Sequence, residues 1–226
     1  MAEEKELVLL DFWVSPFGQR CRIAMAEKGL EFEYREEDLG NKSDLLLRSK
    51  PVHRKIPVLL HAGRPVSESL VILQYLDDAF PGTPHLLPPA NSGDADAAYA
   101  RATARFWATT STGSSTTAGP GCGGSRVSRR RRRGARCGDP RTLERARRPG
   151  VLRRAERRQA RFVDVALVPF TAWFYSYESA RFSVRVAPRL AAWARRAAGS
   201  TPSSSTPSPE KVYDFVGVLK KKYGVE

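Results

Sequence analysis

Cysteine, histidine and long apolar runs are all scarce in this chain of 226 residues, and each scarcity argues against a class of protein. The three cysteines, Cys21, Cys122 and Cys137, stand too far apart for a disulfide framework or a zinc site built from close pairs. The three histidines form no pattern of metal ligands or of a catalytic triad, so we expect no metal. No apolar run approaches the roughly 18 residues of a membrane span, and the charged N-terminus does not resemble a secretory signal. We therefore expect a cytoplasmic protein with no membrane partner.

The net charge of +14 is concentrated in one segment. Residues 109–161 contain sixteen arginines, no lysine and three acidic residues, which together account for +13 of the total. The segment also lacks aromatic residues, isoleucine and methionine, so it cannot bury enough apolar surface to offset the chain entropy lost on folding. A genuine disordered insert is one interpretation. A nucleic-acid-binding element is a weaker one, because Arg129–Arg133 has no interleaved aromatic residues.

Residues 1–82 alternate between strand and helix patterns, as in an α/β domain. The apolar run Leu7–Phe12 predicts a buried strand, and Ser15 followed by Pro16 predicts the start of a helix that ends at Gly29. Four further elements are expected: a strand at 32–34, a helical segment at 43–49, a hairpin at 57–66 and a helix at 67–80. The order β-α-β-α-β-β-α is that of a thioredoxin-like domain.

A linker rich in proline, glycine and small polar residues is expected at 83–93, before a helical domain at 94–226. Its first helix should run from Asp94 to Trp107, and helical sequence returns after Phe162. Residues 109–161 and about 197–206 interrupt this domain and are expected to be disordered as written.

Seven motifs resemble those of the tau class of plant glutathione transferases, in the same order and at the same spacing. They are Phe12–Phe17, Asn41–Ser43, Pro51–Leu59, Glu68–Ile72, Ala104–Trp107, Phe162–Leu167 and Ala187–Leu190. The resemblance implies an α/β thioredoxin-like N-terminal domain, an all-α C-terminal domain and a homodimer. It also implies that glutathione is the co-substrate and is conjugated to small hydrophobic electrophiles in detoxification.

The departure from this family after Ala108 is interpreted as a shift of reading frame. Family members continue with a pattern like Asp-Tyr-(Val/Ile)-Asp-(Arg/Lys)-Lys, whereas this chain continues with Thr-Thr-Ser-Thr-Gly-Ser. Every threonine codon begins with AC, so restoring one nucleotide gives codons ending in AC, which encode Asp, Tyr, His or Asn. The segment can then read Asp-Tyr-Val-Asp-Arg-Lys, and 197–206 re-reads in a similar way. We expect the chain as written to be less stable and less active than a restored one.

The resemblance implies a role for Ser15, at the start of the first helix, in stabilising the glutathione thiolate. Its hydroxyl and the positive end of the helix both favour the anion, although a plain helix cap would look the same in sequence. Ile56, before an expected cis bond to Pro57, would pair through its backbone with the cysteinyl part of glutathione.

The charged ends of glutathione are expected to meet a second group of residues. Glu68 suits the ammonium group, and Ser69 with the N–H groups at a helix start suits the γ-glutamyl carboxylate. Lys42 and Lys55 are candidates for the glycyl carboxylate. Lys50 stands where relatives usually have asparagine and is assigned no role.

The resemblance further implies a pocket for the electrophile between the two domains. Phe17, Trp107, Trp173 and Tyr177 are candidates for its walls by position, although each alone is explained as well by the protein core. Cys21 is expected to be packed and inert.

Two other functions would explain some of the same sequence motifs. A carrier that binds glutathione and hydrophobic ligands without turnover would have the same motifs. A thiol–disulfide reductase would need a cysteine at position 15, where this chain has Ser15.

Resequencing the coding DNA across the arginine-rich segment tests the frame-shift interpretation. We expect one nucleotide to be missing after the codon of Ala108, with the family pattern restored when it is inserted. A verified open frame that encodes the arginine-rich run would contradict it.

Overall fold

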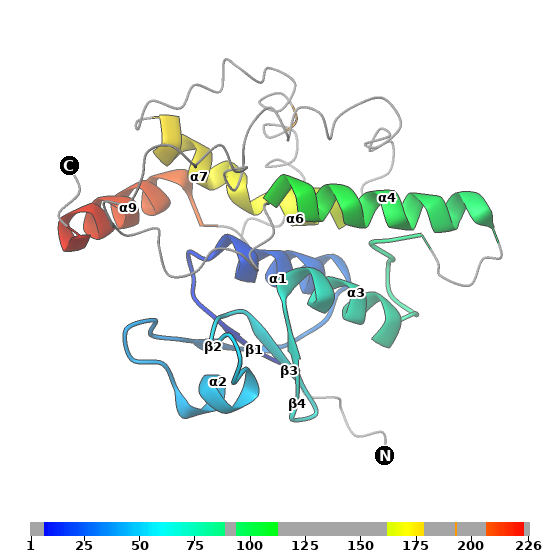
Figure 1. Ribbon diagram of the computed structural model, residues 1–226, viewed down its shortest axis with the longest axis horizontal. Helices are drawn as coiled ribbons and strands as arrows, with labels where there is room; N and C mark the ends of the chain where they lie inside the picture. The colour runs from blue at the N-terminus through cyan, green and yellow to red at the C-terminus, as the bar shows by residue number, and fades with distance from the viewer. Residues whose placement is uncertain (1–6, 89–93, 113–161, 179–192, 194–206, 224–226) are drawn as a thin grey trace.

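The computed structural model describes residues 7–88, 94–112, 162–178, 193 and 207–223. Four strands form one sheet in the order β2-β1-β3-β4 (Figure 1), namely β1 (Leu7–Asp11), β2 (Glu33–Glu36), β3 (Val58–His61) and β4 (Arg64–Ser67). β1 pairs parallel with β2 and antiparallel with β3, and β3 forms a hairpin with β4. Three helices complete this unit: α1 (Pro16–Glu27), α2 (Asp44–Ser49) and α3 (Ser69–Ala79). The predicted order of elements is confirmed.

The two central strands of the sheet, β1 and β3, are buried on both faces because helices cover each face. Leu7 and Leu9 of β1 belong to the core shared with α1 and α3, whereas Val8 and Leu10 pack with Leu46 of α2. This alternation follows from the two-residue period of a strand. Figure 1 accordingly shows α1 and α3 on one side of the sheet and α2 on the other.

The remaining helices lie on the far side of α1 and α3 from the sheet (Figure 1). They are α4 (Ala95–Thr112), α6 (Phe162–Leu167), α7 (Pro169–Glu178) and α9 (Pro209–Tyr223). Phe162 and Val165 of α6 are buried in the same core as Leu9, so one apolar core runs from the sheet into the helical part. Helix α6 therefore supports the first domain as well as its own.

Helix α4 extends beyond the end that the sequence predicts. It continues from Trp107 to Thr112, which corrects the expected disorder for the first four residues of the segment 109–161. Ala108, at the predicted boundary, is fully buried, and α4 packs along α6. The extension begins at this buried alanine, whereas Thr109 and Thr110 within it are exposed and threonine and serine have weak helix propensity. The predictions for 113–161 and for 197–206 concern residues outside those that the structure describes.

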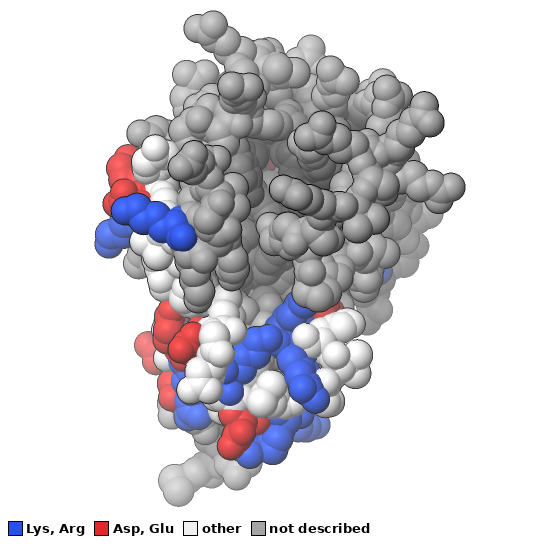
Figure 2. Space-filling view, turned by 60° about the vertical axis from the view of Figure 1, so that its left-hand side comes forward, with Lys and Arg blue, Asp and Glu red and all other residues white. Residues whose placement is uncertain are grey.

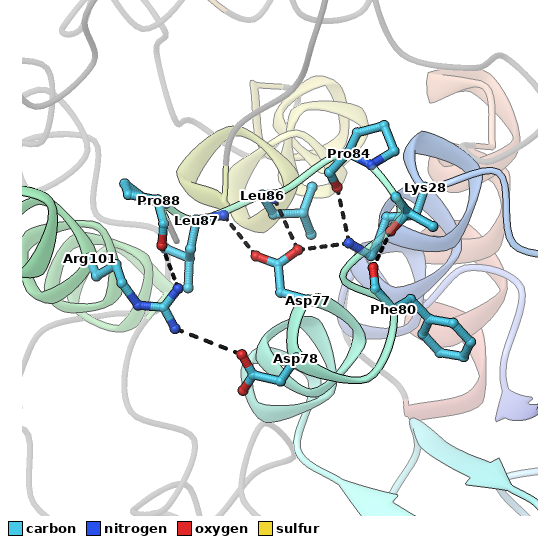
Figure 3. A network of polar contacts seen from close by, with 10 residues as sticks. Lys28, Asp77, Asp78, Phe80, Pro84, Leu86, Leu87, Pro88 and Arg101 are labelled. Atoms are coloured by element: carbon cyan, nitrogen blue, oxygen red, sulfur yellow. Dashed lines mark hydrogen bonds and ion pairs between the residues drawn. The ribbon is translucent and has the colours of Figure 1, made fainter. Parts of the chain in front are cut away.

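A buried ion pair holds the segment that follows α3 (Figure 3). Lys28 Nζ lies 2.9 Å from Asp77 Oδ1, and both side chains are almost completely buried. Asp77 also accepts the backbone N–H groups of Leu86 at 3.0 Å and Leu87 at 2.8 Å, while Lys28 donates to the carbonyl of Pro84 at 3.0 Å. The first part of the predicted linker is thereby fixed to α3 and to the end of α1.

Replacing Asp77 with asparagine leaves the buried ammonium of Lys28 without its anion, so we expect the free energy of unfolding to fall by about 3–5 kcal/mol. Asp78→Asn is the matched control, because the Asp78 side chain is 66% exposed and lies 4.0 Å from Arg101 on α4. Its effect should stay below about 1 kcal/mol. Urea unfolding measures both changes, and equal losses would show that the buried pair does not fix this segment.

Candidate active site

Ser15 lies in the turn between β1 and α1, at the N-cap position of the helix. Its backbone is extended (φ −63°, ψ 118°), and its Oγ accepts the N–H of Gly18 at 3.3 Å. Pro16 occupies the start of the helix, so the predicted helix start is confirmed. Because Oγ accepts within the helix, its own hydrogen is available to an anion beside the positive helix end.

Asp11 ends β1 next to this turn and is fully buried. Its carboxylate approaches Gly18 so closely that a Cβ on that residue would lie 1.6 Å from Oδ1, so only glycine fits there. Arg22 Nε forms an ion pair with Asp11 Oδ2 at 3.2 Å. Burial raises the pKa of Asp11 to about 7, although the charge of Arg22 opposes the rise.

Two basic side chains hold the carboxylate of Glu68, the residue before α3. Lys50 Nζ lies 2.8 Å from Glu68 Oε1, and His53 Nδ1 lies 3.3 Å from the same oxygen. Burial acts to raise the pKa of Glu68, but the hydrogen bonds and charges of Lys50 and His53 outweigh it and lower that pKa. Lys50, which was assigned no role from the sequence, is buried beside the acid expected to bind the ammonium group of glutathione.

Ser69, the first residue of α3, is buried and accepts a hydrogen bond from Arg20 on α1. Arg20 Nη1 lies 3.0 Å from Ser69 Oγ, and Arg20 Nε donates to the carbonyl of Ala166 on α6 at 2.9 Å. The guanidinium lies over the rings of Phe17 and Phe170, 5.1 Å and 5.2 Å from their centroids, and the two rings themselves meet edge to face. Sequence reasoning missed Arg20, because no local pattern marks a buried arginine.

The other residues expected to contact glutathione lie in the part of the chain between β2 and β3, before and after α2. The bond between Ile56 and Pro57 is cis, as expected. Lys42 Nζ donates to the carbonyl of Arg54 at 2.8 Å, which brings it to the loop that also carries the exposed Lys55. On the face in Figure 2, basic side chains with some acidic ones gather on the lower part of the molecule, at the level of the sheet and α2 in Figure 1.

The aromatic residues expected to line the electrophile pocket fall into two clusters. Phe17 and Trp107 are half-buried against the core that includes α6, whereas Trp173 packs against a cluster containing Val14 of the Ser15 turn. The side chain of Tyr177 lies outside the description. Sequence reasoning missed three rings beside Trp173 that meet edge to face, those of Phe12, Trp13 and Phe215.

Cys21 is fully buried in α1, where burial raises the pKa of its thiol far above the ordinary value. The thiol therefore stays protonated and is a poor nucleophile. Within the described ranges there is no group of three or more histidine, cysteine or acidic side chains that could hold a metal ion. No helix in the described part of the chain is both long and apolar enough to cross a membrane.

Comparison with known proteins identifies the family. Residues 9–84 match the family "Glutathione S-transferase, N-terminal domain". The chain is 70% identical over 243 aligned positions to probable glutathione S-transferase GSTU1 of Oryza sativa subsp. japonica, and all of both chains is covered. It is also similar to the tau-class glutathione S-transferase MiGSTU of mango, Mangifera indica, at 28% identity and a TM-score of 0.69, over 95% of this chain and 98% of that one. The chain belongs to the tau class of plant glutathione S-transferases.

Two further relatives support the assignment of this tau transferase. The crystal structure of rice GST1 (OsGSTU1) in complex with glutathione matches it at 67% identity and a TM-score of 0.80, over 99% of this chain and 100% of that one. Glutathione S-transferase U19 of Arabidopsis thaliana is 39% identical over 231 positions, which cover 96% of this chain and 97% of that one. The expected family, its fold and its transferase activity on glutathione are thus confirmed.

The raised pKa of Asp11 predicts how the stability of the transferase depends on pH. Between the unfolded value of 3.8 and the folded value of about 7, the folded chain holds a proton that the unfolded chain has lost. The contribution of Asp11 to stability therefore falls as pH rises through this window, by about 1.4 kcal/mol per pH unit.

Asp11→Asn removes this titration, so the stability of this variant relative to the unmodified chain should increase between pH 4.5 and about pH 7 and then level off. Urea unfolding of the variant and of the unmodified chain at several pH values measures the difference in stability. The titration of all groups that the two proteins share cancels in this difference. A difference that does not change with pH would contradict the prediction.

Proposed function

We propose that this transferase joins the sulfur of glutathione to small hydrophobic electrophiles and that Ser15 stabilises the attacking thiolate. The thiol first loses its proton to solvent; the thiolate then forms a bond to an electrophilic carbon, and where that carbon bears a leaving group, this departs with its electron pair. The observation that carries the proposal is the Ser15 hydroxyl, which caps α1 and keeps its hydrogen for donation. A thiol with an ordinary pKa of about 8.5 is mostly protonated at neutral pH, so such a donor increases the reactive fraction.

The polar groups around Ser15 support a single orientation of glutathione. Glu68 would receive the ammonium group, and Ser69 would donate to the γ-glutamyl carboxylate because its Oγ already accepts from Arg20. Ile56 would pair with the cysteinyl backbone, and Lys42 and Lys55 would meet the glycyl carboxylate.

The electrophile would lie between the two domains, near the aromatic residues that surround the Ser15 turn. We place the boundary of the domains in the segment 83–93, with 1–82 before it and the helical domain 94–226 after it. Phe17, Trp107, Trp173 and Tyr177 remain the proposed wall residues. The three widely spaced cysteines support a reducing, cytosolic setting for this reaction.

We also propose that residues 109–161 are translated out of frame. The number of residues identical to those of the rice relative supports this proposal. An identity of 70% over 243 aligned positions is about 170 identical residues, so about 56 of the 226 residues of this chain differ from the rice relative. That number is close to the 53 residues between positions 109 and 161.

Ser15→Ala tests the catalytic role. Loss of one hydrogen bond to an anion should lower kcat/KM with 1-chloro-2,4-dinitrobenzene about 10- to 100-fold at pH 6.5. Ser208→Ala is the matched control, because Ser208 accepts the N–H of Lys211 at the start of α9 in the same kind of cap. Equal activity of Ser15→Ala and the unmodified chain would contradict the proposal, and binding of glutathione without any turnover would favour the carrier.

A homodimer is the proposed assembly, and the exposed apolar residues of α3 and α4 support it. Tyr99 and Phe106 are seven residues apart on α4, so they share one helix face, and they are 74% and 57% exposed. Val71 on the adjacent α3 is 49% exposed. Large apolar side chains exposed on one helix face, as Tyr99 and Phe106 are, are typical of a protein interface.

Phe106→Glu places a charge in the proposed interface and should shift the protein towards monomer by at least tenfold in the dissociation constant. Val218→Glu on α9 is the control, since Val218 is 60% exposed on another helix. Analytical ultracentrifugation of the full chain measures both. A dimer unaffected by Phe106→Glu would place the interface elsewhere.

A further inference from the structure

Side chains from other elements hold the turn that carries Ser15. The N–H of Ser15 donates to the carbonyl of Phe12 at 2.8 Å and closes the turn. Between these residues, the N–H of Trp13 donates to Glu36 Oε1 at 3.2 Å, and the carbonyl of Trp13 accepts from Arg22 Nη2 at 2.7 Å. Both backbone groups of Trp13 are thus bound by charged side chains, one from β2 and one from α1.

Arg22 is itself held on two sides. Its Nε pairs with the fully buried Asp11, and its guanidinium lies over the ring of Tyr34, 5.8 Å from the centroid. The hydroxyl of Tyr34 in turn donates to Glu36 Oε2, the carboxylate oxygen not used by Trp13. The contacts form a closed ring from Arg22 through Trp13, Glu36 and Tyr34 back to Arg22.

A ring of this kind restricts how the turn can move. The Arg22 side chain is only 14% exposed, so water competes weakly for its hydrogen bond to Trp13. A charge-assisted bond to a backbone carbonyl fixes the peptide plane itself, whatever side chain Trp13 carries. Ser15 follows two residues later, and a hydrogen bond to sulfur is sensitive to small changes in direction and distance.

We propose that Arg22 and Glu36 are positioning residues for the thiolate, because they fix the backbone of Trp13 and thereby the direction of the Ser15 hydroxyl. Neither side chain needs to touch glutathione. The inference rests on the proposed role of Ser15 and adds two residues to it.

The test is the pKa of the glutathione thiol when bound to the full chain, read from thiolate absorbance near 240 nm as pH is varied. Arg22→Met should raise this pKa by about 0.5–1 and lower kcat at pH 6.5 about 3- to 10-fold, with less than a twofold change in the dissociation constant of glutathione. Arg35→Met is the matched control, because Arg35 on β2 pairs with Glu33 at the exposed surface. It should leave the thiol pKa unchanged.

Two other variants keep the test decisive if Arg22→Met fails to fold. Glu36→Leu removes the other side chain that binds the Trp13 backbone, and it changes a residue on an exposed edge strand. This variant should also raise the thiol pKa, as Arg22→Met does. Arg22→Lys should be intermediate, since an ammonium can reach Asp11 or Trp13 but lacks the fork that reaches both. Folded Arg22→Met and Glu36→Leu chains with an unchanged thiol pKa would overturn the inference.

Ser15→Ala separates this failure from that of the proposed function. If Ser15→Ala raises the thiol pKa and Arg22→Met and Glu36→Leu do not, only the positioning role of Arg22 and Glu36 is wrong. If Ser15→Ala leaves the pKa unchanged, the role of Ser15 and the inference fall together. If both hold, Arg22→Met should add no further shift in a chain that already carries Ser15→Ala.

Discussion

In the proposed mechanism, the direction of one hydroxyl group is the constraint on which the chemistry of this molecule depends. Ser15 has a single hydrogen to donate, and its oxygen is oriented by the N–H of Gly18 within the first turn of α1. That turn is possible because Gly18 has no Cβ where the Asp11 carboxylate approaches. Burial also moves the pKa of Asp11 to about 7, so its negative charge opposes a nearby thiolate less than a solvated aspartate would.

A second constraint joins the glutathione-binding part to the helical part. Arg20 donates to Ser69 on α3 and to the carbonyl of Ala166 on α6, so one buried guanidinium contacts both. The apolar core is likewise continuous between them. A change in the helical part that moves Ala166 would therefore reach Ser69 through the hydrogen bonds of Arg20. This is the physical reason to expect a weakened enzyme if residues 109–161 are translated out of frame, as proposed.

Local sequence patterns predicted much of the first domain, because a helix cap or a hairpin depends on a few neighbouring residues. Ser15 at the start of α1 is an example. The cis bond between Ile56 and Pro57 was expected instead from its position in a thioredoxin-like fold, because a local pattern does not reveal a cis bond. The charged contacts that shape the site could not be predicted in this way. Arg20 meets a carbonyl 146 positions away, and Lys50 reaches Glu68 from the end of another helix. Such pairings are set by tertiary packing. The local pattern also failed to predict that α4 continues to Thr112.

A crystal structure of the full chain with bound glutathione would show directly which group holds the sulfur. We expect the sulfur to lie within about 3.5 Å of Ser15 Oγ, in line with the donated hydrogen, and the Trp13 backbone to keep its contacts with Arg22 and Glu36. A sulfur held instead by a different donor, with Ser15 Oγ turned away or beyond about 4.5 Å, would contradict this expectation.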